Sequence, residues 1–318
     1  MNTKPSIGGE IPPPLPGGGK GQIDHVSWAD KHAFGILLGP GLMILALLAI
    51  LPLLHVLYIS AHTWELTKPW LGRPFVGLDN YRTFVHSPKV WESLFLTVKF
   101  TVSSVGFSML IGFLLAILLD QKIRAQSLFR SVFMIPMMIT PVVIGLSWRF
   151  MLDPTFGVIN YLLRYIGIPP QAWLTNPRLV FPTIVTVDVW QWTPLVMLII
   201  LAGLQGIPQT PYEAAKIDGA TGWLVFRRIT LPSLRPVLLV ALLLRTMDAI
   251  RTFDTTYILT GGGPGTTTEL ASIHLYRKGL KYFHMGDASA YALIVLVTIM
   301  LASFIYIKIM ERGVTGGK

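Results

Sequence analysis

A short polar stretch lies between two long apolar runs and reads Thr210-Pro-Tyr-Glu-Ala-Ala-Lys-Ile-Asp-Gly-Ala-Thr221. Thr210 is followed by Pro211 at the first helical position and by Glu213 three residues after Thr210, which is the pattern of a capping box. Gly219 can adopt the left-handed conformation that ends a helix. A second short helix is predicted over residues 223–229, and Pro232 is expected to stop it. The stretch therefore predicts a helical elbow.

The composition places this elbow in a membrane protein. Of the 318 residues, 52% are hydrophobic and only 13% are charged, which is too apolar for an ordinary soluble fold. The chain has no cysteine, which excludes disulfides and thiolate metal sites. Its net charge of +10 is better explained by membrane orientation than by nucleic-acid binding, because no basic and aromatic residues interleave.

Six apolar stretches reach the ~20 residues that a helix needs to cross a bilayer. They cover roughly Phe34–Ser60, Leu94–Leu119, Ser131–Met151, Val180–Leu204, Val237–Leu259 and Ala288–Met310. Pro136 and Pro141 in the third stretch and Pro194 in the fourth predict kinks. The predicted fold is an all-α integral membrane protein with six transmembrane helices and the elbow between the fourth and fifth.

This fold divides the chain into three parts. A flexible tail rich in Pro and Gly is expected over residues 1–33, a membrane domain over 34–312 with the elbow loop at about 206–236, and a short tail over 313–318. Six spans place both termini on one side of the membrane. The loops on that side carry a small excess of Lys and Arg over the opposite loops, which favours cytoplasmic termini and a cytoplasmic elbow.

The elbow has the features of a contact surface for another protein. Ala214 and Ala215 are small, so a partner can approach the backbone closely, and Lys216 and Asp218 supply polar groups around them. The alternative is a capped hairpin without a partner, in which Glu213 only caps its own helix.

A more specific indication comes from the residue pattern. Glu213-Ala214-Ala215 and Asp218-Gly219-Ala220 are followed by Phe226, Ile229, Leu231-Pro232 and Pro236, and together they resemble the EAA loop of ABC importer permeases. In that family the loop forms coupling helices that sit in a groove of the ATP-binding subunit. The resemblance implies that the ATPase contact consists of Glu213, Ala214, Ala215, Lys216, Asp218, Gly219, Ala220 and Thr221.

A second block runs from Arg245 to Pro264 and resembles the sugar-type branch of these permeases, which contains maltose, trehalose and glycerol-phosphate importers. The resemblance implies a bacterial inner-membrane subunit that forms half of a translocation pathway. It also implies a second, related permease, a pair of ATP-binding subunits that hold ATP and magnesium, and an extracytoplasmic solute-binding protein. The loop over 61–93 is short, so contacts made by the large external domain of the maltose-type subunit are not carried over.

Four charges recur every three residues with alternating sign at Arg245, Asp248, Arg251 and Asp254. Ionisable groups at membrane depth normally face a bundle interior or a watery cavity. Steps of three drift around a helix, so the four are expected to form a spiral. Two interpretations stay open: an ion-pair network for structure or gating, or contact with the solute, for which Tyr257 is a further candidate.

The fourth apolar stretch adds Asp188, Trp190, Gln191 and Trp192. Aromatic faces beside hydrogen-bonding groups suit a sugar ring, although Trp is also common at membrane interfaces and in helix packing. Trp148-Arg149 in the third stretch is expected to anchor in the interface, with the Arg149 side chain extended toward water.

Enzymatic sites are not indicated. The sequence has no His-Glu-x-x-His metal motif, no Gly-x-Ser-x-Gly elbow and no Walker A pattern, and Gly261-Gly-Gly-Pro264 is interpreted as a turn. We therefore expect no catalytic residue, metal site or cofactor in this chain. The leading hypothesis is a carbohydrate permease driven by a separate ATPase, with Arg149, Arg245 and Arg251 leaving an anionic solute open. The alternatives are a secondary transporter that uses Asp248 and Asp254, and a membrane assembly factor.

Overall fold

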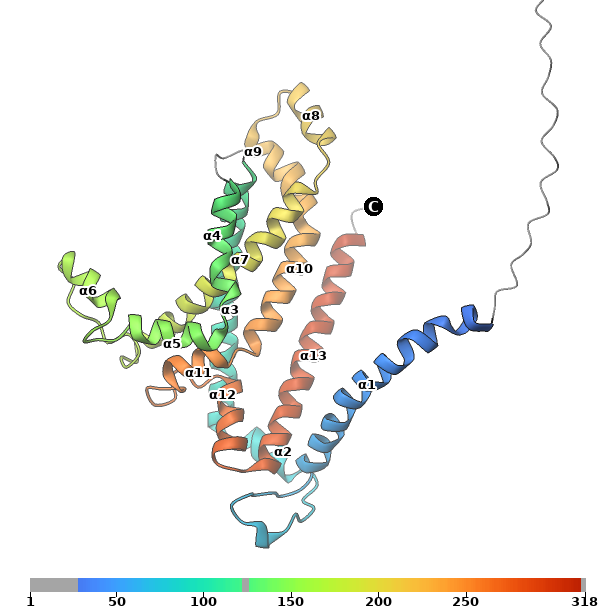
Figure 1. Cartoon of the computed structure of the whole chain (residues 1–318), viewed down its shortest axis with the longest axis vertical. Coiled ribbons are helices and arrows are strands. Elements are labelled where there is room, and N and C mark those ends of the chain that lie inside the picture. The colour runs from blue at the N-terminus through green and yellow to red at the C-terminus, as the bar shows by residue number, and fades with distance from the viewer. Residues whose placement is uncertain (1–27, 122–125, 316–318) are drawn as a thin grey trace, which may run out of the picture. The chain divides into compact units, whose positions relative to one another are not determined.

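The computed structural model describes residues 28–121 and 126–315 (Figure 1). Apart from two isolated bridges, His62 with Phe75 and Glu65 with His284, these residues form helices, turns and loops. The predicted tails lie outside the described residues at 1–27 and 316–318. Helix α1 (Trp28–Ser60) begins before the predicted end of the first tail, and α13 (Met285–Thr315) continues past the predicted start of the second.

The described residues contain five helices that are long and apolar enough to cross a membrane. These are Leu38–Ser60 in α1, α3 (Pro88–Asp120), α7 (Val180–Gln205), the continuous helix Gly222–Ile250, and Met285–Lys308 in α13. The prediction of an all-α membrane fold is confirmed. The chain divides by its contacts after His55, and the unit that begins at Val56 holds the remaining elements.

The third predicted span is broken. Helices α4 (Gln126–Met138) and α5 (Pro141–Met151) meet at 95°, where a single kinked helix over Ser131–Met151 was predicted. Thr140 is extended (φ −63°, ψ 142°), as expected before a proline, and Pro141 starts α5 because it cannot donate a hydrogen bond to the preceding turn. Counting the bent pair as one span gives six.

The packing of α3 against α7 forms the centre of the second unit. Gly112 lies so close to α7 that a Cβ atom there would be 2.8 Å from Cγ1 of Val196. Small residues let membrane helices approach in this way. Buried Ala116 and Leu119 of α3 continue the contact with Met197 and Ile200 of α7. Helix α10 (Leu231–Ile250) packs beside both helices. A Cβ atom on Gly203 of α7 would lie 2.8 Å from Cγ1 of Val237 in α10.

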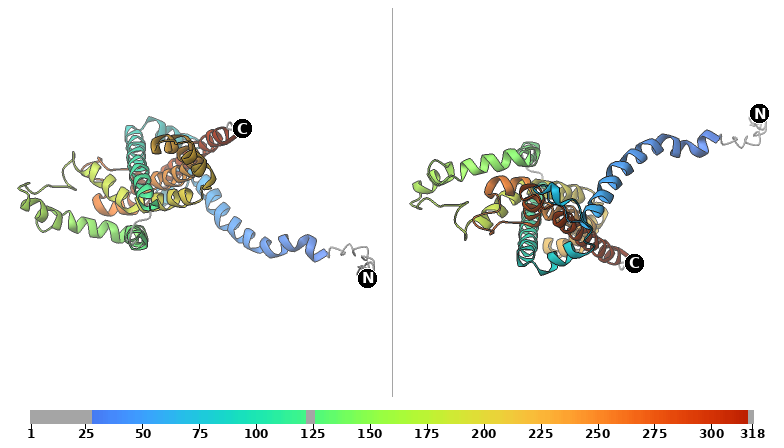
Figure 2. Two further views of the ribbon diagram at one scale, coloured as in Figure 1. Left: turned by 90° about the horizontal axis from the view of Figure 1, so that it is seen from above. Right: turned by 90° about the horizontal axis from the view of Figure 1, so that it is seen from below.

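Shorter helices gather at the end of α7 and α10 that is remote from the elbow (Figure 1). They are α2 (Asp79–His86), α11 (Asp254–Thr260) and α12 (Ala271–Tyr276), which continues into a π-helical turn over Arg277–Lys281, whereas α6 (Val158–Tyr165) lies apart from them to one side. The fifth predicted span, Val237–Leu259, is therefore wrong at its end: α10 stops at Ile250, and α11 packs against α5 as a separate helix. Seen from above and below, α5 and α6 project sideways from the group of α3, α7 and α10 (Figure 2).

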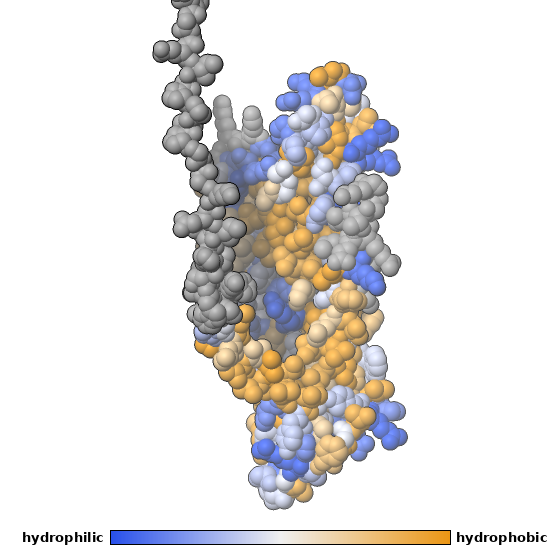
Figure 3. All heavy atoms as spheres, turned by 90° about the vertical axis from the view of Figure 1, so that its right-hand side faces the viewer, coloured by the Kyte–Doolittle hydropathy of each residue, from blue (hydrophilic) through white to orange (hydrophobic). Residues whose placement is uncertain are grey.

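Surface hydropathy agrees with a membrane environment. On the face drawn in Figure 3, apolar side chains cover the middle and hydrophilic side chains gather toward both ends. Large apolar side chains on α3 and α13, such as Val102, Leu114, Met300 and Phe304, are more than half exposed. A bilayer would remove this surface from water.

Candidate functional site

The elbow forms a well-defined short helix, α8 (Thr210–Ile217), at one tip of the second unit (Figure 1). Gly219 is left-handed (φ 68°), as predicted. Its N–H donates to the Lys216 carbonyl at 3.2 Å, and the Ala220 N–H donates to the Ala215 carbonyl at 2.9 Å. These two bonds make a Schellman motif, which fixes the chain direction after the helix.

The predicted capping box is not formed. Gln209 occupies the N-cap position, where its carbonyl accepts the N–H groups of Tyr212 (2.9 Å) and Glu213 (3.0 Å), and its side chain makes no capping bond. Thr210 is already inside the helix and cannot act as the cap. The Glu213 side chain is consequently exposed and available to a partner.

Most of the predicted ATPase contact faces solvent. Ala215 is buried and Ala220 is half-buried, whereas the exposed members are Glu213, Ala214, Lys216, Asp218, Gly219 and Thr221. Ile217 is not among these predicted contact residues, although it is 87% exposed. Its position three residues after Ala214 and four after Glu213 places it on their face of the helix. An apolar residue in an otherwise polar turn was the signal that could have identified it.

The return from the elbow differs from the predicted second short helix. Helix α9 (Gly222–Val225) passes through a π-helical turn, Phe226–Thr230, directly into α10. Pro232 does not stop the helix, because the wider turn carries the hydrogen bond from the Leu231 N–H back to the Phe226 carbonyl. The hydroxyl groups of Tyr212 and Thr230 are 3.0 Å apart and tie α8 to this turn.

A buried ion-pair network joins the three central helices. Arg245 of α10 has no exposed side-chain surface and pairs with Asp188 of α7. Its Nη2 also donates to Ser104 Oγ of α3 at 2.7 Å, and Ser104 donates in turn to Asp188. Asp248 lies 3.3 Å from Arg245 and 3.8 Å from Arg251. The network pairs the charges inside the bundle, although the buried Nε of Arg245 has no acceptor among the described residues.

The predicted spiral of four charges is wrong in its second half. Arg251 lies just past the last residue of α10 and is 75% exposed, and Asp254 is the exposed first residue of α11. Only Arg245 and Asp248 share a membrane helix. The break after Ile250 removes the helical geometry on which the spiral depended.

The candidates on α7 face in different directions. Asp188 and Gln191 are buried in the protein, and the Gln191 side-chain Oε1 accepts a hydrogen bond from the Thr255 hydroxyl at 3.3 Å. Trp190 is 41% exposed and meets Trp148 edge to face, with ring centroids 5.4 Å apart. It lines an apolar groove of about 610 Å³ together with Pro136 of α4. Trp192 is half-buried.

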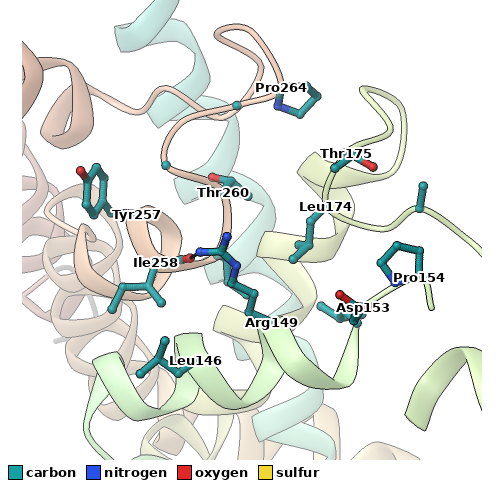
Figure 4. Close-up of a pocket in the computed structure, with 15 residues that line it drawn as sticks. Leu146, Arg149, Asp153, Pro154, Leu174, Thr175, Tyr257, Ile258, Thr260 and Pro264 are labelled. Atoms are coloured by element: carbon teal, nitrogen blue, oxygen red, sulfur yellow. Dashed lines mark hydrogen bonds between the residues drawn. The ribbon is translucent and has the colours of Figure 1, made fainter. Parts of the chain in front are cut away.

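A larger cavity of about 700 Å³ opens at the end of the bundle remote from α8 (Figure 4). Its walls come from α5, from the segment before α7, and from α11 with the following turn. Residues that line this cavity include Leu146, Arg149, Asp153, Leu174, Tyr257, Ile258 and Thr260. The Arg149 guanidinium Nη1 donates to the Ile258 carbonyl at 3.3 Å, and the exposed side chain lines the cavity. Its anchoring in the membrane interface stays a prediction.

Local hydrogen bonds hold each wall of this cavity. Buried Asn160 of α6 pairs with Gln171 through both its amide groups, at 2.9 and 3.0 Å. On the opposite wall, the carbonyl of the lining residue Gly261 accepts from Arg277 at 2.5 Å. Arg277 in turn binds Glu269, which is also bound by His274 (2.8 Å). The His274 hydrogen bond, with the charge of Arg277, keeps the pKa of Glu269 below its usual value.

Asp153 is oriented by the turn that it starts. Its Oδ1 accepts the Thr155 N–H (2.8 Å), the Thr155 hydroxyl (2.5 Å) and the Phe156 N–H (3.2 Å). The Thr155 hydroxyl, together with these N–H groups, lowers the pKa of Asp153 and keeps it ionised. Within residues 28–121 and 126–315, no group of three His, Asp or Glu side chains is placed to hold a metal ion.

Comparison with known proteins places this architecture. A family model described as "Binding-protein-dependent transport system inner membrane component" matches residues 108–316. The trehalose/maltose transport system permease protein MalF of Thermococcus litoralis is 38% identical over 273 residues, which cover 85% of this chain and 90% of that protein. The sulfoquinovosyl glycerol transport system permease protein SmoG of Agrobacterium fabrum is 33% identical over 282 residues, with 89% and 91% covered.

A solved structure shares the fold. It is a bacterial ABC transporter involved in the import of the acidic polysaccharide alginate, which superposes with a TM-score of 0.78 at 23% identity and covers 89% of this chain and 96% of its own. The prediction of a transport subunit instead of an enzyme is confirmed by the permease names of the relatives. The chain belongs to the family of binding-protein-dependent transport system inner membrane components, as a permease of the ABC importer class.

Proposed function

We propose that this chain forms half of the translocation pathway of a carbohydrate importer and couples that pathway to a separate ATPase through α8. The carrying observation is that relatives named for trehalose/maltose and for sulfoquinovosyl glycerol align with 85% and 89% of this chain. The exposed face of α8, with its Schellman end, supports the coupling role.

The proposed assembly has four kinds of partner. A second, related permease completes the pathway, and a pair of ATP-binding subunits holds ATP and magnesium. An extracytoplasmic solute-binding protein delivers the solute, which agrees with the family description and with a solved alginate transporter bound to a periplasmic protein. Membrane lipid surrounds the spans. The excess of Lys and Arg on one side supports cytoplasmic termini and a cytoplasmic α8.

The coupling route follows from the contacts of α8. When ATP closes the two ATPases, α8 is carried with the subunit that it contacts. The Tyr212–Thr230 contact and the continuous helix Gly222–Ile250 pass this displacement to α10. Because Arg245 binds α10 to Asp188 on α7 and Ser104 on α3, the three helices move together. Transport then follows from different solute affinities of the outward and inward conformations.

The proposed solute path runs along the accessible aromatic and polar candidates. Trp190 and Trp192 present ring surface that a sugar can contact, and Tyr257 borders the cavity at the end of the bundle. Gln191, Asp188 and Arg245 are buried and are assigned to holding the helices in place. Asp248 is paired with two arginines, and Asp254 lies outside the membrane helix, so neither supports a proton-coupled carrier.

Reconstitution tests the proposed function. The chain is placed in proteoliposomes with its partner permease, the ATP-binding subunits and the binding protein, and uptake of labelled trehalose and maltose is measured. We expect uptake only with ATP and magnesium and only with all the partners present. Uptake by this chain alone under a pH gradient would refute the proposal.

A further inference from the structure

The charge of the solute can be inferred from whether a carboxylate already neutralises each of Arg149, Arg245 and Arg251. This inference rests on the proposed carbohydrate importer. Arg245 is fully buried and neutralised by Asp188 and Asp248, and Arg251 faces Asp248 at 3.8 Å. Arg245 is therefore not accessible to a solute anion, and the exposed Arg251 does not line either of the two cavities described above. Arg149 remains, and its side chain lies in the cavity at the end of α7 and α10 remote from α8.

The Arg149 guanidinium is held in place but retains unused donors. One nitrogen donates to the Ile258 carbonyl at the end of α11, and among the described residues no ion pair engages the group. Figure 4 shows the side chain rising from α5 between Leu174 and the Ile258 carbonyl, with Thr260 beyond it. An arginine has five N–H donors in a fixed fork, so four stay available to a bound molecule.

Asp153 places a carboxylate in the same cavity. Its Oδ1 is occupied by the Thr155 and Phe156 donors of the turn, whereas Oδ2 accepts no hydrogen bond from the described residues. The cavity thus offers one fixed donor fork and one fixed acceptor, with aliphatic surface from Leu146 and Leu174 between the polar groups. Among the described residues, Arg149 and Asp153 are the only charged ones that line this cavity, so the lining carries no net charge that would favour an anion.

We propose that this cavity is an entry subsite that binds a neutral sugar ring. Hydroxyl groups both donate and accept hydrogen bonds, so adjacent hydroxyls can donate to Asp153 and accept from Arg149. The aliphatic walls contact the C–H surface of the ring, and the volume of about 700 Å³ lies within the ~300–1,000 Å³ typical of small-molecule sites. A sugar acid binds less well, because its carboxylate would share the cavity with Asp153.

A matched pair of probes tests the charge preference directly. The assembled transporter is placed in lipid nanodiscs without ATP and titrated with methyl glucoside or methyl glucuronide, and saturation-transfer NMR gives apparent dissociation constants. We expect the glucoside to bind at least about tenfold more tightly than the glucuronide, since the latter adds a negative charge near Asp153. Equal binding, tighter glucuronide binding, or no glucoside signal would overturn the proposal.

Two substitutions locate the site. Asp153→Asn keeps an oxygen for the turn but replaces the free acceptor with a donor, so glucoside binding should weaken about tenfold and glucuronide binding should strengthen. Arg149→Gln should weaken the binding of both probes about tenfold or more. Arg164→Gln, at an exposed arginine of α6 outside the cavity, is the matched control and should change neither.

The outcomes separate this inference from the proposed function. If Asp153→Asn and Arg149→Gln bind both probes as the wild type does, in samples with unchanged melting temperature, the subsite does not exist. If the probes respond as expected but reconstituted vesicles show no ATP-driven sugar uptake, the subsite stands and the importer proposal fails.

Discussion

Replacing Arg245 by Met is expected to destabilise the protein strongly. The substitution removes the guanidinium that has no exposed surface and leaves the Asp188 carboxylate buried beside a thioether. Removing one partner of a buried pair typically costs ~3–5 kcal/mol, because the other charge is left without compensation. Ser104 still donates to Asp188, but a single hydroxyl does not replace a full positive charge.

The magnitude can be checked by a double-mutant cycle. At roughly 2 °C per kcal/mol for a chain of this size, Arg245→Met should lower the melting temperature by roughly 6–10 °C. Asp188→Leu should have a smaller destabilising effect, because Arg245 keeps the Asp248 carboxylate at 3.3 Å. The double variant should recover most of the loss, since Asp248 keeps Arg251 at 3.8 Å and no buried charge remains unpaired.

The assay is thermal unfolding of the assembled transporter in nanodiscs, followed by tryptophan fluorescence, with sugar uptake measured in parallel. Single variants that melt like the wild type but fail to transport would refute a structural network and assign Arg245 to solute or gating. A double variant as unstable as the singles would also contradict the account, because it would mean that the two charges do not act as a pair.

Three further outcomes follow from local geometry. Gly219→Ala should cost ~1–2 kcal/mol of elbow stability and lower ATP-driven uptake, because Gly219 is left-handed and its Cβ position is otherwise open. Gly222→Ala is the matched control, since its Cβ position is equally open and its φ is not positive. Equal transport by the two variants would count against the elbow geometry. Glu269→Gln should lower the melting temperature at neutral pH, and the difference from the wild type should vanish as pH falls below about 4.5. His274 and Arg277 lower the pKa of Glu269 in the folded state, so the carboxylate stabilises the fold above its unfolded-state pKa and this stabilisation is lost as pH falls through its folded-state pKa. A difference in melting temperature that does not depend on pH would contradict this. Tyr212→Phe should reduce the transport rate without displacing the ATP-binding subunit, because it removes only the 3.0 Å contact with Thr230, and an unchanged rate would exclude that contact from the coupling route.

The sequence was sufficient where the decisive interactions are local. Length and hydropathy placed α1, α3, α7 and α13 close to their observed bounds, since a membrane span depends on its own composition. The left-handed conformation of Gly219 was predictable for the same reason, because helix ends depend on neighbouring residues.

The errors arise where backbone alternatives compete or where distant segments meet. Two prolines in the third span predicted a kink, but nothing local to them predicted a 95° break. Pro232 was expected to end a helix, and a π-helical turn absorbs it instead. At the N-terminus of α8, the predicted capping box with Thr210 as N-cap does not form, because Gln209 takes the N-cap position one residue earlier.

Both candidate sites depend on long-range packing. Asp188 and Arg245 are 57 residues apart, so their spacing carries no signal that they pair. The cavity joins residues 146–154, 172–175 and 257–264, which approach only when α11 packs against α5. The sequence identified Arg149 and Tyr257 individually, but it could not place Asp153 beside them.

Co-purification with the ATP-binding subunit shows whether α8 is the coupling surface. Ile217→Asp introduces a charge on the most exposed apolar residue of α8, and Leu280→Asp does the same to an exposed leucine at the opposite end of the second unit. We expect Ile217→Asp to lose both the ATP-binding subunit and ATP-driven uptake, whereas Leu280→Asp retains the ATP-binding subunit. Undiminished co-purification and uptake with Ile217→Asp would contradict this.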